Sequence, residues 1–257
     1  MRRHPLPRIV SLAPSVTSIL IALGARRELV GVSKWCGEVA NVKGLDAVGD
    51  CWAMDASEVL KLGPTLLIGS VPFKTKTVEQ ILAQPVPFLA LNPRSLADID
   101  GDIELLGRLT GKGAAARKLI QKMHRAFERV ARTARQARSK PRVYSEAWPN
   151  PRISSPPWAA ELIELAGGRM AVAGGKQVTD AEVAAAQPEI IILAWTATGA
   201  RSNPRRAYQV GAWKNVPAIR ERRVVAIRDE LLNTPGPPLI EGATALLHAI
   251  HPELVRR

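Results

Sequence analysis

Tryptophans stand out among the side chains that could carry a function, because the chain has six of them but only two tyrosines and three phenylalanines. Trp35, Trp148 and Trp195 follow stretches typical of β-strands, Trp52 lies in a loop, and Trp158 opens a helix. Aromatic side chains of a core usually lie inside elements, whereas indoles in loops can form the walls of a site for a flat, mostly apolar ligand. The sequence therefore predicts such a site, with the alternative that individual tryptophans only pack loops onto the core.

Side chains suited to metal binding or catalysis are sparse. No histidine lies in a loop that follows a strand, and the four are His4, His124, His248 and His251. A metal site built on imidazoles is therefore not expected. The patterns G-x-S-x-G and G-x-x-x-x-G-K-[ST] are missing, as is G-x-G-x-x-G after the first strand. These observations favour binding without catalysis; an enzyme, the alternative, would use Glu146, Asp229 or Glu230 as acid or base.

The charge of the chain is concentrated in one segment. The net charge is +13, and between Lys112 and Lys140 ten basic residues face a single acid, Glu128. Arg125, Arg129 and Arg132 are spaced as one face of a helix. The simplest interpretation is the solvated face of a long helix. A membrane surface or a nucleic acid is the alternative partner, although no nucleic-acid motif or interleaved aromatic residue supports the latter, and no nucleic acid is expected.

The elements that must position these residues alternate between strands and helices in the first and last parts of the chain. We expect strands at 8–12, 29–32, 66–68, 88–91, 142–145, 190–194 and 224–227, and helices at 15–23, 56–62, 76–83, 157–166, 181–185 and 238–250. Between them, two helices are expected at 98–109 and 114–138, with no strand. Such alternation is typical of open parallel α/β sheets.

Two segments, one on each side of the long helix, repeat the same pattern of a short helix, a proline and a buried strand. Each copy also has an aspartate as the expected N-cap of its helix. The first copy contains Asp55, Glu58, Val59, Pro64 and 66–68, and the second contains Asp180, Glu182, Val183, Pro188 and 190–192. The repeat predicts two related α/β lobes at 1–110 and 141–257, joined by a helical segment at 111–140.

Ligands of open α/β sheets bind beyond the carboxyl ends of the strands. The residues there supply the predicted site, which comprises Trp35, Cys51, Trp52, Ser70, Val71, Phe73, Trp148, Pro149, Trp195, Asp229 and Glu230. Cys36 and Cys51 could form a disulfide, but two cysteines do not decide it. The first seven residues have the basic start of a secretory signal without its apolar stretch, and no apolar run is long enough to cross a membrane. We therefore expect a cytoplasmic monomer, or an extracytoplasmic one if the natural chain begins further upstream.

Several segments resemble the iron-complex and vitamin B12 substrate-binding proteins of ABC importers, and are most similar to the cobalamin-binding branch. They are 8–20 (RIVSLAPSVTSIL), 31–36 (GVSKWC), 59–68 (VLKLGPTLLI), 158–168 (WAAELIELAGG) and 235–242 (PGPPLIEG). The resemblance implies a class III periplasmic-binding-protein-like fold, with two parallel-sheet lobes on one long backbone helix. It also implies that a cobalamin-like corrinoid is bound between the lobes as a ligand, with no prosthetic group.

The resemblance bears on partners as well. Family members dock on their permease through one surface glutamate per lobe, and the matching positions here are Ser57 and Ala181, each one place before a glutamate. A one-residue offset turns a helical side chain by about 100°. The resemblance therefore implies either an ABC permease partner or a stand-alone relative without one. Ferric siderophores or haem are the alternative ligands; siderophore sites favour Arg and Tyr, whereas Tyr144 and Tyr208 lie outside the expected loops.

Overall fold

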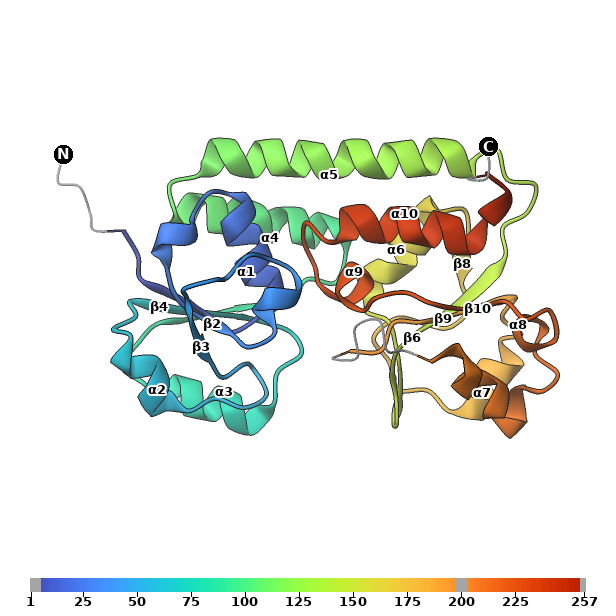
Figure 1. The fold of residues 1–257 in the computed structure, drawn as a ribbon, viewed down its shortest axis with the longest axis horizontal. Helices are drawn as coiled ribbons and strands as arrows, with labels where there is room; N and C mark the ends of the chain where they lie inside the picture. Colours follow the sequence, from blue (N-terminus) through green and yellow to red (C-terminus); the bar gives the residue numbers. More distant parts are fainter. Residues whose placement is uncertain (1–5, 197–202, 255–257) are drawn as a thin grey trace. The chain divides into compact units, whose positions relative to one another are not determined.

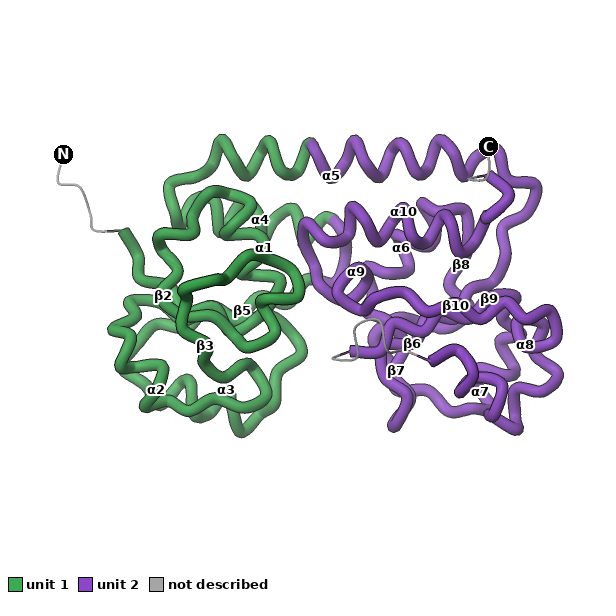
Figure 2. Tube along the Cα trace, viewed as in Figure 1, with its two compact units in different colours: residues 1–93, 97–121 green, residues 94–96, 122–257 purple. Residues whose placement is uncertain are grey.

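The structure is a computed structural model of the chain, and it describes residues 6–196 and 203–254. By its contacts the chain divides into two compact units (Figure 2). Unit 1 comprises residues 1–93 and 97–121, and unit 2 comprises residues 94–96 and 122–257. The division falls inside the long helix α5 (Gly113–Ala134), which occupies most of the linking segment expected at 111–140.

Unit 1 is built around a five-stranded, wholly parallel sheet of order β3-β2-β1-β4-β5. Figure 1 shows α1 and α4 on one face of this sheet and α2 and α3 on the other. The strands are β1 (Ile9–Ser11), β2 (Leu29–Ser33), β3 (Asp46–Val48), β4 (Leu66–Ser70) and β5 (Phe88–Leu91). The helices are α1 (Pro14–Ala22), α2 (Ala56–Lys61), α3 (Thr75–Leu82) and α4 (Leu96–Leu109). The edge strand β3 was not expected, because only three residues form it.

Unit 2 has a five-stranded sheet of order β10-β9-β6-β7, with β8 also paired to β6. Its strands are β6 (Arg142–Pro149), β7 (Arg152–Ser154), β8 (Arg169–Met170), β9 (Ile190–Leu193) and β10 (Val224–Ala226). The helices are α6 (Pro157–Leu165), α7 (Asp180–Ala185), α8 (Pro217–Arg220), α9 (Glu230–Asn233) and α10 (Leu239–Ile250). The sheet is parallel except for β7, which runs antiparallel to β6. In Figure 1, α6 and α10 cover one face and α7 covers the other.

The repeated segments form matching units, α2 with β4 and α7 with β9. Asp55 caps α2 as expected, because its carboxylate accepts from the Ser57 N–H at 2.8 Å. The expected cap Asp180 is wrong, since it is the first helical residue of α7 and Thr179 is the cap. The Thr179 hydroxyl and the Glu182 carboxylate bond each other's backbone N–H groups, which is a capping box. The reciprocal bonds with Glu182 therefore make Thr179 the cap of the helix.

Each unit has its own apolar core beneath its sheet. In unit 1 the core includes Val10 of β1 and Leu67 of β4, together with Leu12, which directly follows β1. In unit 2 it includes Ile191 and Leu193 of β9, and all four residues of that strand are buried. The cores hold the strands in register, and the register fixes where each strand ends and where its loop begins.

Candidate functional site

The predicted site residues fall into two groups. Unit 1 holds Trp35, Cys51, Trp52, Ser70, Val71 and Phe73, and unit 2 holds Trp148, Pro149, Trp195, Asp229 and Glu230. The placement of a ligand between the units stays a prediction.

In unit 1, Asp50 bonds the indole of Trp35 and the backbone of Trp52. Strands β2 and β3 lie to one side of the central strand β1, and β4 and β5 lie to its other side. The strand order therefore reverses at β1, and ligands of open sheets bind at such a switch point. The Trp35 Nε1–H, just after β2, donates to Asp50 Oδ2 at 2.8 Å. Asp50 Oδ1 accepts from the backbone N–H groups of Trp52 and Ala53 at 2.8 and 2.9 Å. Sequence reasoning missed Asp50, although an Asp that bonds the N–H two residues on is a known turn signal.

Trp52 forms part of the wall of an open surface pocket of about 410 Å³ in unit 1. The other lining residues come from the segment before α2, from α2 and from the start of α3, and they include Met54, Glu58, Lys74 and Thr77. The Thr77 hydroxyl donates to the Trp52 carbonyl oxygen at 2.7 Å and so fixes the loop. The indole is thus presented by a fixed backbone.

The remaining predicted residues of unit 1 lie mostly inside it. Cys51 is buried, and burial raises the pKa of its thiol from 9.0 to about 12, so the thiol is neutral at neutral pH. Phe73 packs edge-on against Phe88 with ring centroids 6.0 Å apart. The Ser70 hydroxyl is buried without a hydrogen-bond partner among the described residues, and Val71 is half-buried. Cys36, like Cys51, is a free thiol, so the two form no disulfide.

In unit 2, the end of β6 carries the predicted Trp148 and Pro149. The expected strand stops at residue 145, but β6 continues to Pro149 because β7 pairs with its second half. Trp148 therefore lies inside the strand and not in a loop, yet its side chain remains exposed. Its Nε1–H donates to the Asn150 carbonyl oxygen at 2.8 Å.

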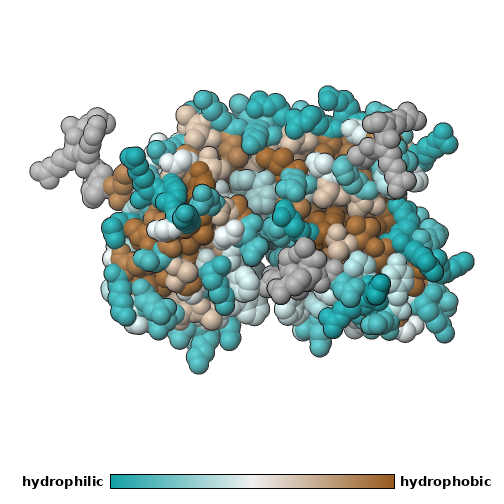
Figure 3. Space-filling model, viewed as in Figure 1, coloured by the Kyte–Doolittle hydropathy of each residue, from teal (hydrophilic) through white to brown (hydrophobic). Residues whose placement is uncertain are grey.

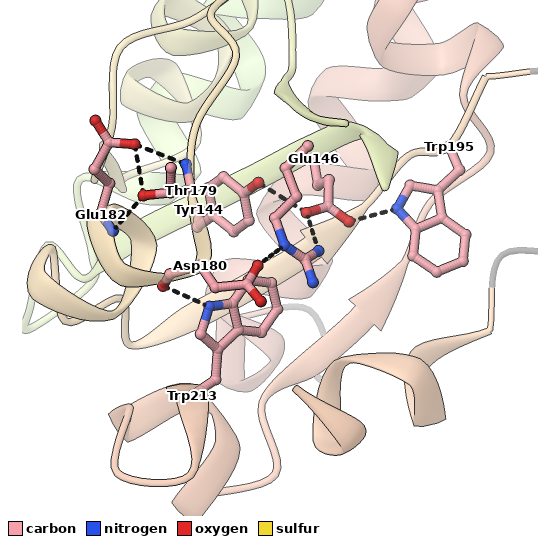
Figure 4. Close-up of polar contacts among 8 residues, drawn as sticks. Tyr144, Glu146, Thr179, Asp180, Glu182, Trp195 and Trp213 are labelled. Atoms are coloured by element: carbon pink, nitrogen blue, oxygen red, sulfur yellow. Dashed lines mark hydrogen bonds and ion pairs between the residues drawn. The ribbon is translucent and has the colours of Figure 1, made fainter. Parts of the chain in front are cut away.

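A buried hydrogen-bond network centres on Glu146 of β6, which is completely buried (Figure 4). Its carboxylate accepts from the Tyr144 hydroxyl at 2.8 Å and from the Trp195 Nε1–H at 2.8 Å. It also forms an ion pair with Arg152 Nη1 at 2.7 Å. Burial, and then the Glu146 charge, raise the pKa of Tyr144 well above its usual range, so the phenol stays a neutral donor. Glu146 is held by three donors, which suits a structural anion better than an acid or base.

Arg152 of β7 joins this network to α7. Its guanidinium bonds Asp180 as well as Glu146, and it lies 4.3 Å from the centre of the Trp213 ring. Burial lowers the pKa of Arg152, but the bonds to Asp180 and Glu146 outweigh burial and leave this pKa raised. The Trp213 Nε1–H donates to the Asp180 carbonyl oxygen at 3.0 Å. Arg152 and Asp180 therefore tie the hairpin of β6 and β7 to the start of α7.

The network forms one wall of a pocket of about 260 Å³ that lies wholly within unit 2. Aromatic and polar side chains both line it, namely Glu146, Pro149, Asn150, Arg152, Leu193, Trp195, Arg206, Ala207, Gln209, Val210 and Trp213. The Arg206 guanidinium lies 5.7 Å from the centre of the Trp195 ring. Sequence reasoning missed Arg206 and Gln209, because they come from the 3₁₀ segment Pro204–Gln209, far from any strand end.

Two of the five tryptophans considered as walls of a ligand site, Trp195 and Trp158, are buried. Trp195 is buried because its N–H reaches Glu146, so it contributes an edge of the pocket and not an open wall. Trp158 is buried in α6, where its Nε1–H donates to the Leu232 carbonyl oxygen at 2.9 Å. The alternative interpretation, packing of loops onto the core, therefore describes Trp158 best.

Asp229 and Glu230 lie at the start of α9. Glu230 is buried and pairs with Arg228 at 3.2 Å, and Arg228 also pairs with Glu241 at 3.5 Å. Asp229 is half-buried at the N-cap position of α9. Their part in ligand binding stays a prediction.

The positions expected to dock on a permease lie on short helices. The Ser57 hydroxyl on α2 donates to Asp55 at 2.7 Å, and Ala181 lies in the first turn of α7. Glu58 is exposed, whereas the carboxylate of Glu182 is already used in the cap of α7. A role for any of them in docking stays a prediction.

Residues 6–196 and 203–254 lack two further features. No three His, Cys, Asp or Glu side chains gather there in an arrangement that could hold a metal ion. Within the same residues, every helix is too short or too polar to span a bilayer.

Comparison with known proteins reveals relatives along almost the whole chain. A profile of the family described as periplasmic binding protein matches residues 9–231. An uncharacterized ABC transporter substrate-binding lipoprotein of Bacillus subtilis is 26% identical over 259 residues, which cover 96% of this chain and 80% of the relative. A vitamin B12-binding protein of Vibrio parahaemolyticus is 25% identical over 268 residues, which cover 100% of this chain and 93% of the relative.

Solved structures show the same fold. The apo form of a periplasmic heme-binding protein from Roseiflexus sp. RS-1 matches with a TM-score of 0.81 and 24% identity, over 97% of this chain and 100% of that one. The predicted α/β fold with two parallel-sheet lobes, like that of class III periplasmic binding proteins, is confirmed.

The expectation of a cytoplasmic protein is wrong. The family and the relatives are periplasmic or lipoprotein substrate-binding proteins, and they point to an extracytoplasmic location. The error came from taking the first seven residues as evidence of location. With a matching fold and a family profile that spans residues 9–231, the chain belongs to the periplasmic binding protein family, whose members are substrate-binding proteins.

Proposed function

We propose that this protein binds a cobalamin-like corrinoid as the substrate-binding component of an importer, without altering the ligand. The observation that carries the proposal is the exposure of three indoles next to strand ends. Trp35, Trp52 and Trp148 are 37%, 55% and 40% exposed, although tryptophan is usually among the more buried residues. The similarity to a vitamin B12-binding protein supports the same ligand class.

The three indoles suit a large flat macrocycle. Each indole offers a broad apolar face, and hydrogen bonds to Asp50 and to the Asn150 carbonyl oxygen fix Trp35 and Trp148. A fixed aromatic side chain loses little conformational entropy when a ligand covers it. Stacking on a ring also adds about 0.5–1.5 kcal/mol beyond the burial of area.

The pocket of unit 2 supplies polar contacts but not room for the whole ligand. At about 260 Å³ it lies below the volume of roughly 300–1,000 Å³ that is usual for sites that enclose a small molecule. Arg206 and Gln209 in its lining can donate to carbonyl groups, and Asn150 can donate or accept. We propose that the pocket receives an amide-bearing side group from the rim of a corrinoid.

Haem is the second candidate, and one observation favours it. Tyr208 is exposed on the segment that lines this pocket, and Arg206 and Arg205 lie two and three residues before it. A phenolate can ligate ferric haem iron, and guanidinium groups pair with carboxylates such as propionates. A ferric siderophore would draw on the same side chains.

The test is calorimetric titration with cyanocobalamin and, separately, with hemin, followed by recovery of the ligand. For the corrinoid, Trp35→Ala, Trp52→Ala and Trp148→Ala should each weaken binding by about 1–2 kcal/mol, which is roughly 5–30-fold. Leu82→Ala is the matched control, because Leu82 is also large, apolar and exposed in unit 1 but lies at the end of α3. It should leave the affinity unchanged.

The results distinguish the candidate functions. The corrinoid is refuted if cyanocobalamin produces neither heat nor quenching of tryptophan fluorescence up to about 100 µM, where binding is weaker than roughly −5.5 kcal/mol. Tight hemin binding that Tyr208→Phe abolishes establishes haem instead. Recovery of a chemically modified corrinoid would show an enzyme and contradict the non-enzymatic part of the proposal.

A further inference from the structure

Helix α5 presents a continuous line of cations that ligand binding does not explain. Lys118, Lys122, Arg125, Arg129 and Arg132, here called the basic stripe, are all exposed. With 3.6 residues per turn, their Cα positions fall within an arc of about 80° around the helix axis. They span about 21 Å along the axis at 1.5 Å per residue.

The buried face of α5 determines which way the basic stripe points. Met123, Ala126, Phe127 and Val130 are buried on that face. Figure 3 shows hydrophilic residues along the outer edge of this helix. Because the buried face anchors the helix, the basic stripe remains turned to solvent as a straight array.

The charges of the stripe are not neutralised locally. Across residues 6–196 and 203–254, none of its five side chains forms an ion pair with a carboxylate. Glu128 is the single acid of α5, and it lies about 80° around the axis from the centre of the stripe. A row of five exposed, unpaired cations creates a positive potential along the helix, which attracts an anionic surface.

We propose that the basic stripe binds the anionic phospholipid surface of a membrane. A straight, rigid row of cations matches a flat charged surface. Binding of single-stranded nucleic acid combines cations with exposed aromatic platforms, whereas the aromatic residue of α5, Phe127, is buried on the far face. The extracytoplasmic location indicated by the relatives places the protein beside a membrane and away from nucleic acid. The stripe would keep the protein close to the bilayer in which a permease resides.

The magnitude follows from the number of cations. A lysine or arginine near an anionic membrane contributes about 1 kcal/mol, which is roughly fivefold in the partition coefficient. Removing three such charges should therefore weaken binding on the order of 100-fold. The attraction should also fall steeply with salt, because the Debye length shrinks from about 10 Å at 0.1 M to about 3 Å at 1 M.

The experiment measures co-sedimentation of the full chain with phosphatidylcholine vesicles containing about 30% phosphatidylglycerol, at about 0.1 M salt. The stripe variant is Lys122→Gln with Arg125→Gln and Arg129→Gln. The control variant, Lys43→Gln with Lys214→Gln and Arg220→Gln, removes the same charge from exposed positions elsewhere. We expect the stripe variant to lose on the order of 100-fold and the control less than about fivefold.

Other outcomes overturn the proposal. Equal losses in the two variants would show an effect of net charge alone, and equal binding to pure phosphatidylcholine would show that charge plays no part. Retention of duplex DNA but not of vesicles at about 0.15 M salt would make the stripe a nucleic-acid surface. If circular dichroism shows that the triple variant is misfolded, the three single variants replace it, each with an expected loss of about fivefold.

Discussion

Replacing Arg152 by methionine should destabilise the protein strongly, although no ligand is involved. The substitution keeps an apolar stem but removes the guanidinium that lies between Glu146, Asp180 and the Trp213 ring. Glu146 is completely buried, so its carboxylate cannot turn to water for a substitute partner. It would retain two neutral donors, the Tyr144 hydroxyl and the Trp195 N–H.

The expected loss is about 3–5 kcal/mol. Removing one partner of a buried ion pair costs this much because an uncompensated charge remains in the interior. Because two hydrogen bonds to Glu146 remain, the cost of leaving its charge without the guanidinium lies at the lower end of this range. The lost contact of the guanidinium with the Trp213 ring adds about 0.5–2 kcal/mol.

Urea unfolding at pH 7.5 followed by far-UV circular dichroism measures the loss. Arg108→Met is the matched control, because Arg108 pairs with Glu104 at 3.6 Å but the two side chains are 67% and 53% exposed. Its cost should stay below about 1 kcal/mol. Combining Arg152→Met with Glu146→Gln should recover at least about 2 kcal/mol, since no charge stays buried. The amide oxygen can accept from the Trp195 N–H, and the amide NH2 can donate to the Tyr144 hydroxyl oxygen.

Two outcomes would refute the reasoning. One is a loss for Arg152→Met no larger than that of the control. The other is additivity of Arg152→Met and Glu146→Gln in the double variant, which would show that the pair is not coupled.

Three further predictions concern stability. Burial raises the pKa of the Cys51 thiol from 9.0 to about 12, so the contribution of this thiol to the free energy of unfolding is fully present below about pH 9 and is lost as the pH rises toward 12. In urea titrations above about pH 9, the free energy of unfolding should therefore decline less steeply in Cys51→Ala, by about 1.4 kcal/mol per pH unit. Burial, and then the charge of Asp98, raise the pKa of Asp102 to about 6. Its contribution to the free energy of unfolding is therefore lost as the pH rises through 6, where the buried carboxyl must ionise. Asp102→Asn removes this ionisation, so it should raise the free energy of unfolding at pH 7.5 by about 1–2 kcal/mol, and the increase should disappear below about pH 4. Gly242→Ala should cost about 2–3 kcal/mol in a thermal melt, since its Cβ would lie 1.9 Å from the Leu231 carbonyl oxygen; an unchanged melting temperature would contradict that clash.

Local patterns predicted most of the fold. The proline breaks at Pro64 and Pro188, each followed by apolar residues, predicted β4 and β9, because helix stops and buried strands are encoded in adjacent residues. The short strands β3, β7 and β8 were missed. The pairing of β8 is decided by a distant segment, because Arg169 and Met170 pair with Arg142 and Val143 of β6. Strand β7 is only three residues long and forms a hairpin with the end of β6, and its sequence shows no strand pattern of its own.

The sequence predicted the exposure of a tryptophan only where no distant side chain buries it. Trp35 and Trp52 lie beside strand ends and are exposed as expected. Trp195 is also beside a strand end, but a bond to Glu146, 49 residues away, buries it. Asp50 and Arg206 were not predicted, because Asp50 acts on Trp35 and Arg206 lies over Trp195, and the sequence does not show that these side chains meet.

The division of the six tryptophans has a spectroscopic consequence. Unit 1 contains Trp35 and Trp52, both exposed, whereas unit 2 contains the exposed Trp148 and the buried Trp158, Trp195 and Trp213. When unit 2 unfolds, three buried indoles enter water and their emission shifts to longer wavelength. The two indoles of unit 1 are already partly exposed, so their emission shifts less when unit 1 unfolds. The wavelength of intrinsic fluorescence therefore reports the state of unit 2. Quenching by added iodide reports the outward indoles of both units.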